Sequence, residues 1–161
     1  MKKNYTVKLK RKRNLKTDYK KRLELIKSNK IRLVIRRSSK TILTQLTKYE
    51  IKGDKTLLLI KSQELKKLGW KNSTRNIQAA YLTGLLLGTK AKKLKIDNAI
   101  ADLGLQKLTK NSVIYAALHG VIDSGLKVPH NKKILLPKEK INKKETEKEF
   151  DEVKNKILKN E

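Results

Sequence analysis

The basic side chains near the start of the chain are the groups whose type and spacing point most directly to a chemistry. Residues 1–40 contain seventeen Lys or Arg and only two acids, Asp18 and Glu24. Such a dense charge favours a polyanionic partner, because like charges repel one another on a compact chain. Nucleic acid is the obvious polyanion, since Lys and Arg displace the counterions of its phosphates. The densest stretch is an arm that contains Lys8, Lys10, Arg11, Lys12, Arg13 and Lys16.

Groups that could catalyse a reaction are few. The chain has two His and no Cys, which leaves little material for nucleophilic triads, zinc sites or disulfides. Asp97, Asp102 and Asp123 could be combined into a metal site, but no spacing rule supports this, and surface or turn roles are favoured. His119 falls in a helical pattern, where packing is expected. For His130, in a predicted loop, phosphate contact and packing are both open.

A glycine pair and the single Trp each have a structural and a functional interpretation. Gly84 and Gly88 lack phosphate-loop spacing, which needs four residues between the glycines and Lys directly after the second. They lie in a helical pattern, where small residues would let the helix approach a sheet closely. Trp70 is expected to be a core residue, with stacking on a base as the alternative.

Length and charge bound the organisation of the chain. It has 161 residues and a net charge of +27, and 37% of its residues are apolar, which fits one domain with a core. Residues 138–161 hold eight Lys and seven acids, so the positive charge belongs to the rest. We expect a basic arm over residues 1–16, a globular domain over residues 17–137 and a charged helical extension over residues 138–161.

The chain shows no sign of a membrane or secretory segment. No apolar run approaches the roughly 18 residues that a membrane-spanning helix needs. The polar residues after Met1 make a signal peptide unexpected. We therefore expect a soluble, intracellular protein without a membrane partner, and no cofactor.

Periodicity and caps indicate which elements position the basic groups. Thr17-Asp18 predicts the start of a helix that runs to about Ser28. Residues 31–38 and 41–49 alternate as strands do, and the two residues between them predict a tight hairpin. Arg36 and Arg37 would point to opposite faces of that hairpin. Residues 56–62 form a continuous apolar run, which predicts a central strand.

The rest of the chain is predicted to be mostly helical, with one further strand. We expect a short helix at 63–68, a long helix from a Ser73 or Thr74 cap to about Lys95, a strand within 99–105, a helix from Asn111 or Ser112 to Gly125, and a charged helix at 139–158. This order predicts an α/β fold, a mixed β-sheet with packed helices in an α/β sandwich, with an extended basic N-terminal arm and a C-terminal helix. The mixed charges of the last helix favour a solvated face. It could also cover a neighbouring protein.

Several ordered motifs resemble those of one family. They include Lys16-Thr-Asp-Tyr19, Arg32-Leu-Val-Ile-Arg-Arg-Ser38, Gly53-Asp54, Gly69-Trp70, Ala79-Ala-Tyr-Leu-Thr-Gly-Leu-Leu86, Asp102-Leu-Gly-Leu105 and Pro129-His130. Over about residues 5–137 the chain resembles the archaeal and eukaryotic branch of universal large-subunit ribosomal protein eighteen. Ser39 stands where that family usually has Asn, and Asn111 replaces a usual Gly.

The resemblance implies a structural role without catalysis, on the ribosome in the cytoplasm. The protein would bind 5S rRNA and help attach it to the large-subunit rRNA in the central protuberance, beside neighbouring ribosomal proteins. The arm, the opening helix and the hairpin would contact RNA through Lys8, Lys10, Arg11, Lys12, Arg13, Lys16, Tyr19, Lys20, Lys21, Arg22, Arg32, Arg36, Ser38 and Lys40. The alternative is an RNA-processing nuclease on a similar α/β sheet, which would need a clustered carboxylate pair with a metal.

Overall fold

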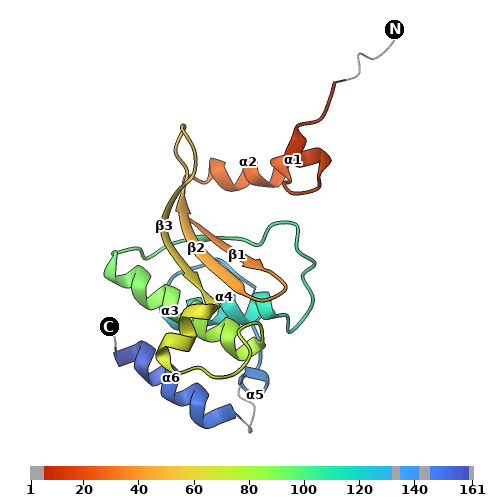
Figure 1. Cartoon of the computed structure of the whole chain (residues 1–161). Helices are drawn as coiled ribbons and strands as arrows, with labels where there is room; N and C mark the ends of the chain where they lie inside the picture. The colour runs from red at the N-terminus through yellow and green to blue at the C-terminus, as the bar shows by residue number, and fades with distance from the viewer. Residues whose placement is uncertain (1–5, 132–134, 142–145, 160–161) are drawn as a thin grey trace.

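A mixed four-stranded sheet is the centre of the molecule (Figure 1). The computed structural model describes residues 6–131, 135–141 and 146–159. The strands lie in the order β3-β2-β1-β4. The antiparallel neighbours are β1 (Arg32–Arg37), β2 (Ile42–Lys48) and β3 (Lys55–Lys61), and β4 (Ile100–Asp102) runs parallel to β1. The predicted α/β class with a mixed sheet is confirmed.

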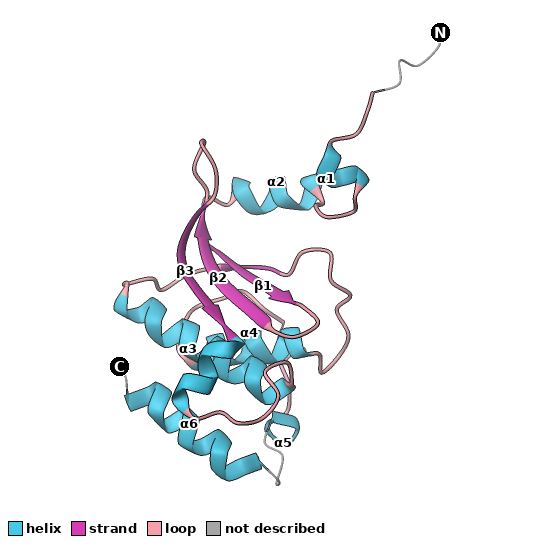
Figure 2. Cartoon of the chain, viewed as in Figure 1, coloured by secondary structure: helices cyan, strands magenta, loops and turns pink. Residues whose placement is uncertain are grey.

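The helices divide between the two sides of the sheet (Figure 2). On one side lie α3 (Ile77–Lys93) and α4 (Val113–Asp123), and α1 (Lys10–Arg13) and α2 (Tyr19–Lys27) lie on the other. Within the arm that was expected to be extended, α1 is one helical turn, which suits four consecutive Lys and Arg because both are good helix formers. None of the helices in the described ranges is long and apolar enough to cross a membrane.

The β1–β2 hairpin closes as its sequence predicted. Arg37 pairs with Ile42, and the Ser38 side chain accepts a hydrogen bond of 2.9 Å from the Thr41 amide. The prediction that β3 is a central strand is wrong, because β3 forms the edge of the sheet. Its apolar run has another cause. Leu57 and Leu58 pack partly against the core from an edge position, while Leu59 is 44% exposed.

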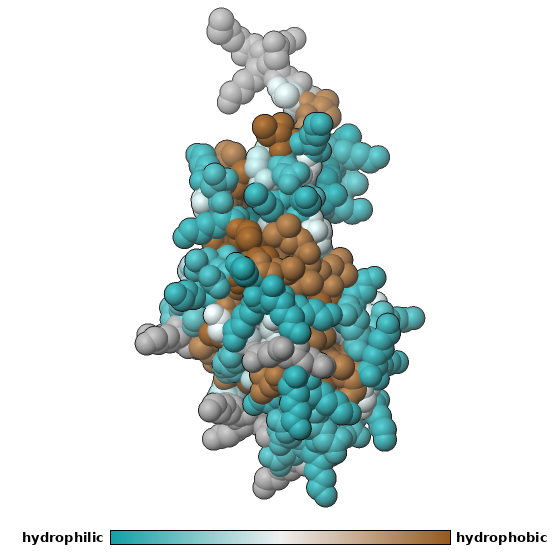
Figure 3. Space-filling view, turned by 90° about the vertical axis from the view of Figure 1, so that its left-hand side faces the viewer, coloured by the Kyte–Doolittle hydropathy of each residue, from teal (hydrophilic) through white to brown (hydrophobic). Residues whose placement is uncertain are grey.

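An apolar area is exposed on the side of the molecule where β3 lies. In Figure 3 the viewer faces the side on which β3 lies in Figure 1, and an apolar area occupies the middle of that face. Hydrophilic side chains dominate above and below it. Ile51, in the turn between β2 and β3, is 94% exposed. This side therefore differs from the strongly basic end formed by the arm and α2.

Glycines let α3 and α4 approach each other closely. A Cβ at Gly84 would overlap the carbonyl oxygen of Ala117, and one at Gly120 would overlap that of Tyr81. Small residues were expected to bring a helix close to the sheet. The structure corrects this: Gly84 and Gly88 face α4, where a Cβ at Gly88 would overlap the Ser124 side chain. The contact is therefore between two helices.

The caps of these helices match the sequence in part. Ser112 caps α4, as one of the two expected residues, with its hydroxyl 3.5 Å from the Tyr115 amide. The α3 cap is Asn76, which accepts a 2.7 Å bond from the Ala79 amide, and neither Ser73 nor Thr74 takes that role. Asn111 has a φ of 59°, so it keeps a left-handed conformation of the kind that Gly adopts readily.

Trp70 is a core residue, and the stacking alternative is excluded by its burial. It is 1% exposed, and its indole nitrogen donates a 3.2 Å bond to the Ser73 carbonyl. It follows the 3-10 helix η1 (Ser62–Leu68), which ends at Gly69 with a φ of 101°. A ring closed off in this way has no face available to a base.

The C-terminal segment is part of the core rather than a fully solvated helix. The described residues form α5 (Lys138–Ile141) and α6 (Glu147–Lys159), and residues 142–145 of the predicted helix lie outside them. Phe150, Val153 and Ile157 are buried, and α6 packs on α3 and η1. The mixed charges correctly indicated the outer face, but spacings of three and four residues also build an apolar inner face.

Replacing Ile157 by Ala should lower the free energy of unfolding by about 2 kcal/mol. Ile157 is fully buried, so the substitution leaves a cavity between α6, α3 and η1. Chemical denaturation measures the loss, and Asp151→Ala, on the exposed face of the same helix, should change stability by less than about 0.5 kcal/mol. Equal effects of the two substitutions would show that α6 does not contribute to the core.

Candidate nucleic-acid interface

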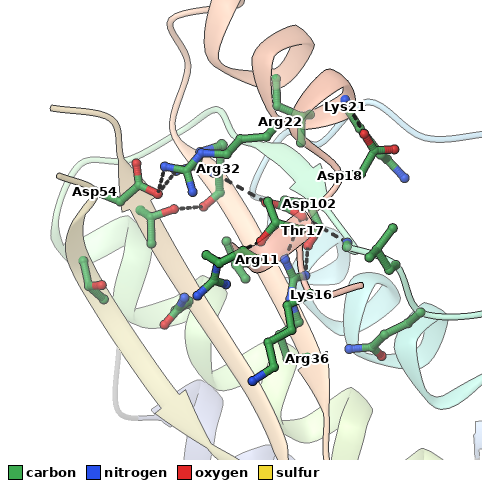
Figure 4. A pocket seen from close by; sticks show the side chains of 18 residues that line it. Arg11, Lys16, Thr17, Asp18, Lys21, Arg22, Arg32, Arg36, Asp54 and Asp102 are labelled. Atoms are coloured by element: carbon green, nitrogen blue, oxygen red, sulfur yellow. Dashed lines mark hydrogen bonds and ion pairs between the residues drawn. The ribbon is translucent and has the colours of Figure 1, made fainter. Parts of the chain in front are cut away.

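A cleft of about 540 Å³ lies between the α1–α2 segment and the open face of the sheet (Figure 4). Its walls come from the arm, α2, all four strands, the β2–β3 turn and the loop after β4. We call it the basic cleft. Its basic lining residues are Arg11, Lys16, Lys21, Arg22, Arg32 and Arg36, and its acidic ones are Asp18, Asp54 and Asp102. The cleft thus combines a majority of cations with three carboxylates that need an explanation.

Asp18 caps α2, the helix that forms part of the cleft wall. Its carboxylate accepts bonds from the amides of Lys20 at 3.0 Å and Lys21 at 3.2 Å, so it caps α2 as the sequence predicted. The cap places Lys20, Lys21 and Arg22 in the first turn of α2, with Tyr19 half-buried at its start. The Asp18 carboxylate is bonded to backbone amides and, across the described ranges, forms no ion pair with the neighbouring cations.

The cations of the arm are free to meet an external anion. Lys8, Lys10, Arg11, Lys12, Arg13 and Lys16 are all exposed. Across the described ranges none of these six side chains forms an ion pair, and Arg11 donates a 2.9 Å bond to the Thr17 hydroxyl. Because their charges are solvated and form no ion pairs in these ranges, phosphates can replace their counterions without breaking an ion pair.

The arginines of the strand are held differently. Arg32 is only 4% exposed, and its guanidinium lies 2.6 Å from Asp54 and 3.5 Å from Asp102. Arg36 donates to the Asp102 carboxylate at 2.8 Å and to the Asp102 carbonyl at 2.6 Å, and about a third of its side chain stays exposed. Arg22 of α2 reaches the same Asp54 oxygen at 2.9 Å. Arg32 is therefore covered by protein groups, while Arg36 and Arg22 are partly open.

Asp54 and Asp102 are site residues that the sequence reasoning did not find. From the sequence, Asp54 was noted only within the Gly53-Asp54 motif, and a surface or turn role was favoured for Asp102. Figure 4 shows Arg22 and Arg32, from different elements, directed at Asp54. One signal was available: an Arg within an otherwise apolar strand needs a carboxylate partner if it is buried. Gly104 also contributes, since a Cβ there would come within 2.9 Å of the Arg36 guanidinium.

The structure brings only some of the predicted RNA contacts together. Arg11, Lys16, Lys21, Arg22, Arg32 and Arg36 line the basic cleft. The remaining predicted residues do not line it, and they are Lys8, Lys10, Lys12, Arg13, Tyr19, Lys20, Ser38 and Lys40. Ser38 and Lys40 belong to the β1–β2 turn, which Arg75 joins with a 2.9 Å bond to the Ser39 carbonyl.

The other titratable candidates have structural contacts. Asp123 accepts a 2.7 Å bond from the Tyr81 hydroxyl and lies 3.5 Å from His119, and burial together with Asp123 raises the pKa of the Tyr81 phenol. His130 lies 2.7 Å from the Val128 carbonyl, and the backbone of Asp97 accepts a bond from Lys127. Within the described part of the chain, no three His, Cys, Asp or Glu residues are grouped so that they could hold a metal ion.

Comparison with known proteins identifies the family of the chain. Residues 3–101 match the profile of a family described as ribosomal large subunit proteins 60S L5 and 50S L18. The chain belongs to this family. The resemblance found in the sequence motifs is thereby confirmed. The family makes the chain an rRNA-binding ribosomal protein of the large subunit, located on the ribosome in the cytoplasm.

Archaeal relatives support the assignment over most of the chain. The large ribosomal subunit protein uL18 of Korarchaeum cryptofilum is 45% identical over 137 residues, which cover 85% of this chain and 70% of the relative. That of Methanococcus maripaludis is 44% identical over 138 residues, covering 86% and 72%. That of Methanoregula boonei is 44% identical over 131 residues, covering 81% and 75%.

Proposed function

We propose that this family member binds 5S rRNA through its arm and basic cleft and helps attach it to the large-subunit rRNA in the central protuberance. Neighbouring ribosomal proteins there are its further partners. The observation that carries the proposal is the set of six exposed arm cations, which form no ion pair with any described residue, at a cleft lined by further Lys and Arg. The resemblance of its motifs to those of 5S-binding proteins gives the RNA its identity.

The basic residues divide into two roles. Lys8, Lys10, Arg11, Lys12, Arg13 and Lys16 of the arm neutralise phosphates, together with Lys20 and Lys21 of α2 and Lys40 of the hairpin. Phosphate contacts supply affinity and fix the orientation of the protein. Arg22 and Arg36, whose guanidinium groups are already oriented by carboxylates, present their open sides to the RNA backbone at the cleft. Arg32 supports them from within the sheet.

Specificity requires more than charge. Folded RNA is recognised through the shape of its helices, its 2′-hydroxyl groups and its unpaired bases. Tyr19, half-buried at the start of α2, is placed among the basic residues and stacks on an unpaired base. Ser38, in the exposed turn of the hairpin, offers a hydroxyl to a second segment of the RNA.

The proposed role involves no chemical step. Asp54 and Asp102 are bonded to arginines and Asp18 to backbone amides, so each carboxylate of the basic cleft has a structural partner. No observation favours the nuclease alternative. The protein thus acts as a rigid holder, in which the sheet and its helices support a cationic surface.

A competition experiment tests the proposal. Filter binding at near-physiological salt should show that the protein prefers 5S rRNA over unrelated RNA of equal length by about 100-fold or more, on the scale of specific nucleic-acid complexes. The RNA should be recovered intact in the presence of Mg²⁺. Equal affinity for both RNAs would refute the proposal, and specific Mg²⁺-dependent cleavage would favour the nuclease.

A further inference from the structure

Besides Asp18, which caps α2, two acids lie inside the surface that should bind a polyanion. Asp54 and Asp102 lie in the basic cleft, where a carboxylate weakens the attraction for phosphate through simple Coulomb repulsion. In a chain with 42 basic residues, two acids in the RNA-binding cleft would only weaken binding if charge were their sole effect. We therefore expect a structural role. Their contacts show what that is.

The acids link four elements into one chain of ion pairs. Arg22 of α2 and Arg32 of β1 share one carboxylate oxygen of Asp54, at 2.9 and 2.6 Å. Arg32 also approaches Asp102 at 3.5 Å, and Asp102 holds Arg36 at 2.8 Å. The series therefore runs from α2 through the β2–β3 turn and across β1 to the end of β4 (Figure 4). Without the carboxylates, three guanidinium groups would repel one another in the same cleft.

The helix α2 depends on this series for its position. None of the residues of α2 is buried, and Leu23 is 54% exposed, so apolar packing holds it only weakly. Among the residues that the structure describes, Arg22 makes the one side-chain hydrogen bond between α2 and the sheet with its connecting turns, and its acceptor Asp54 lies in the β2–β3 turn. The link ends on Asp54, which is itself fixed by the nearly buried Arg32.

We infer that Asp54 is a positioning residue, which holds α2 and its basic side chains over the sheet before RNA arrives, with Asp102 holding Arg36 in the same way. The inference rests on the proposed function, because it assigns the cleft to RNA. Its physical basis is preorganisation: cations already held in the bound arrangement lose less conformational freedom when phosphates bind. Asp54 acts through Arg22 and Arg32 and touches no RNA.

Replacement of Asp54 by Asn separates this role from electrostatics, because the two predict opposite signs. Asp54→Asn raises the net charge by one, so electrostatics alone predicts tighter binding to RNA. Loss of the positioning contact predicts weaker binding, by about tenfold for 5S rRNA at near-physiological salt. The slope of log affinity against log salt should stay unchanged, since no phosphate contact is removed. Glu152→Gln, an exposed acid on α6, is the control with the same change of charge and should bind as tightly as wild type or more tightly.

Arg22→Lys tests the link without disturbing the pair of Arg32 with Asp54. It keeps the net charge and the ability to contact phosphate but loses the guanidinium fork that reaches Asp54. We expect about threefold weaker binding to 5S rRNA. Because Arg22 itself faces the RNA, a loss of affinity in this variant counts only together with faster hydrogen exchange in α2. If Asp54→Asn fails to fold, as judged by circular dichroism, the hydrogen exchange of α2 in Arg22→Lys decides the question.

Amide hydrogen exchange of the free protein provides a measurement that needs no RNA. In Asp54→Asn and Arg22→Lys, the amides of residues 19–27 should exchange faster, while those of α3 stay as slow as in wild type. Unchanged exchange in α2 together with unchanged or tighter RNA binding would overturn the inference. A wild-type protein without preference for 5S rRNA would refute the proposed function, and the exchange of α2 would still decide whether Asp54 positions the helix.

Discussion

We expect the variant in which Lys10, Arg11, Lys12 and Arg13 are all replaced by Gln to bind 5S rRNA about 10²–10³-fold more weakly than wild type at moderate salt. The four side chains form the exposed turn α1, and none is used by the fold in an ion pair within the described ranges. The slope of log affinity against log salt should become shallower by about 3, because each lost phosphate contact removes about 0.7–0.9. Filter binding over a series of salt concentrations measures both quantities.

A matched variant separates local contacts from total charge. Lys66, Lys67, Lys148 and Lys159 are exposed and belong to η1 and α6, on the other side of the sheet from the arm. Their replacement by Gln removes the same four charges, but salt screens interactions beyond about 8–10 Å. We expect a loss of affinity below about threefold. If both variants lose affinity equally, the arm has no special role.

Replacing Gly84 by Ala should lower the free energy of unfolding by about 2–4 kcal/mol. Helix propensity alone predicts the opposite, a gain of about 1 kcal/mol from Gly to Ala in a helix interior. The steric effect outweighs it because the new Cβ would overlap the Ala117 carbonyl oxygen, which belongs to the backbone of α4 and cannot rotate away. The two helices must then separate along their contact.

Urea denaturation followed by the fluorescence of Trp70, which is buried in the same core, measures this loss. The control is Asn155→Ala on the exposed face of α6, where the new residue also raises helix propensity but meets no backbone. We expect it to change stability by less than about 0.5 kcal/mol or to increase it slightly. A stabilised Gly84→Ala protein would show that the α3–α4 contact is not close packed.

The local parts of the fold could be predicted from the sequence because their causes are local. Asp18 and Ser112 are caps whose acceptor oxygens meet amides two or three residues later. The β1–β2 hairpin follows from alternation and from a short turn that Ser38 closes. The basic arm was visible from composition alone, and the family from the order of its motifs.

The parts that could not be predicted depend on residues far apart in the chain. Arg32 and Asp102 are 70 positions apart, and no spacing rule indicates that they share a cleft. The same holds for Gly84 and Ala117, whose contact decides that the glycines face a helix and not the sheet. β3 lies at an edge because β4, much later in the chain, pairs with β1 and not with β3.

The C-terminal helix shows how charge can hide an apolar pattern. Its Lys and Glu residues indicated a solvated helix, yet Phe150, Val153 and Ile157 recur on one face and are buried. The boundary at residue 138 stays a prediction, because the helix beyond it packs on the same core as the globular domain. The helical spacing of these three apolar residues was the sequence signal that the helix packs against the core.

Crosslinking in living cells, with identification of both the attached RNA and the crosslinked peptide, tests whether the arm and the hairpin bind 5S rRNA. We expect the RNA to be mainly 5S rRNA and the crosslinked peptides to come from residues 8–22 and from the β1–β2 turn. Peptides confined to η1 and α6, or RNA without enrichment of 5S rRNA, would contradict this expectation.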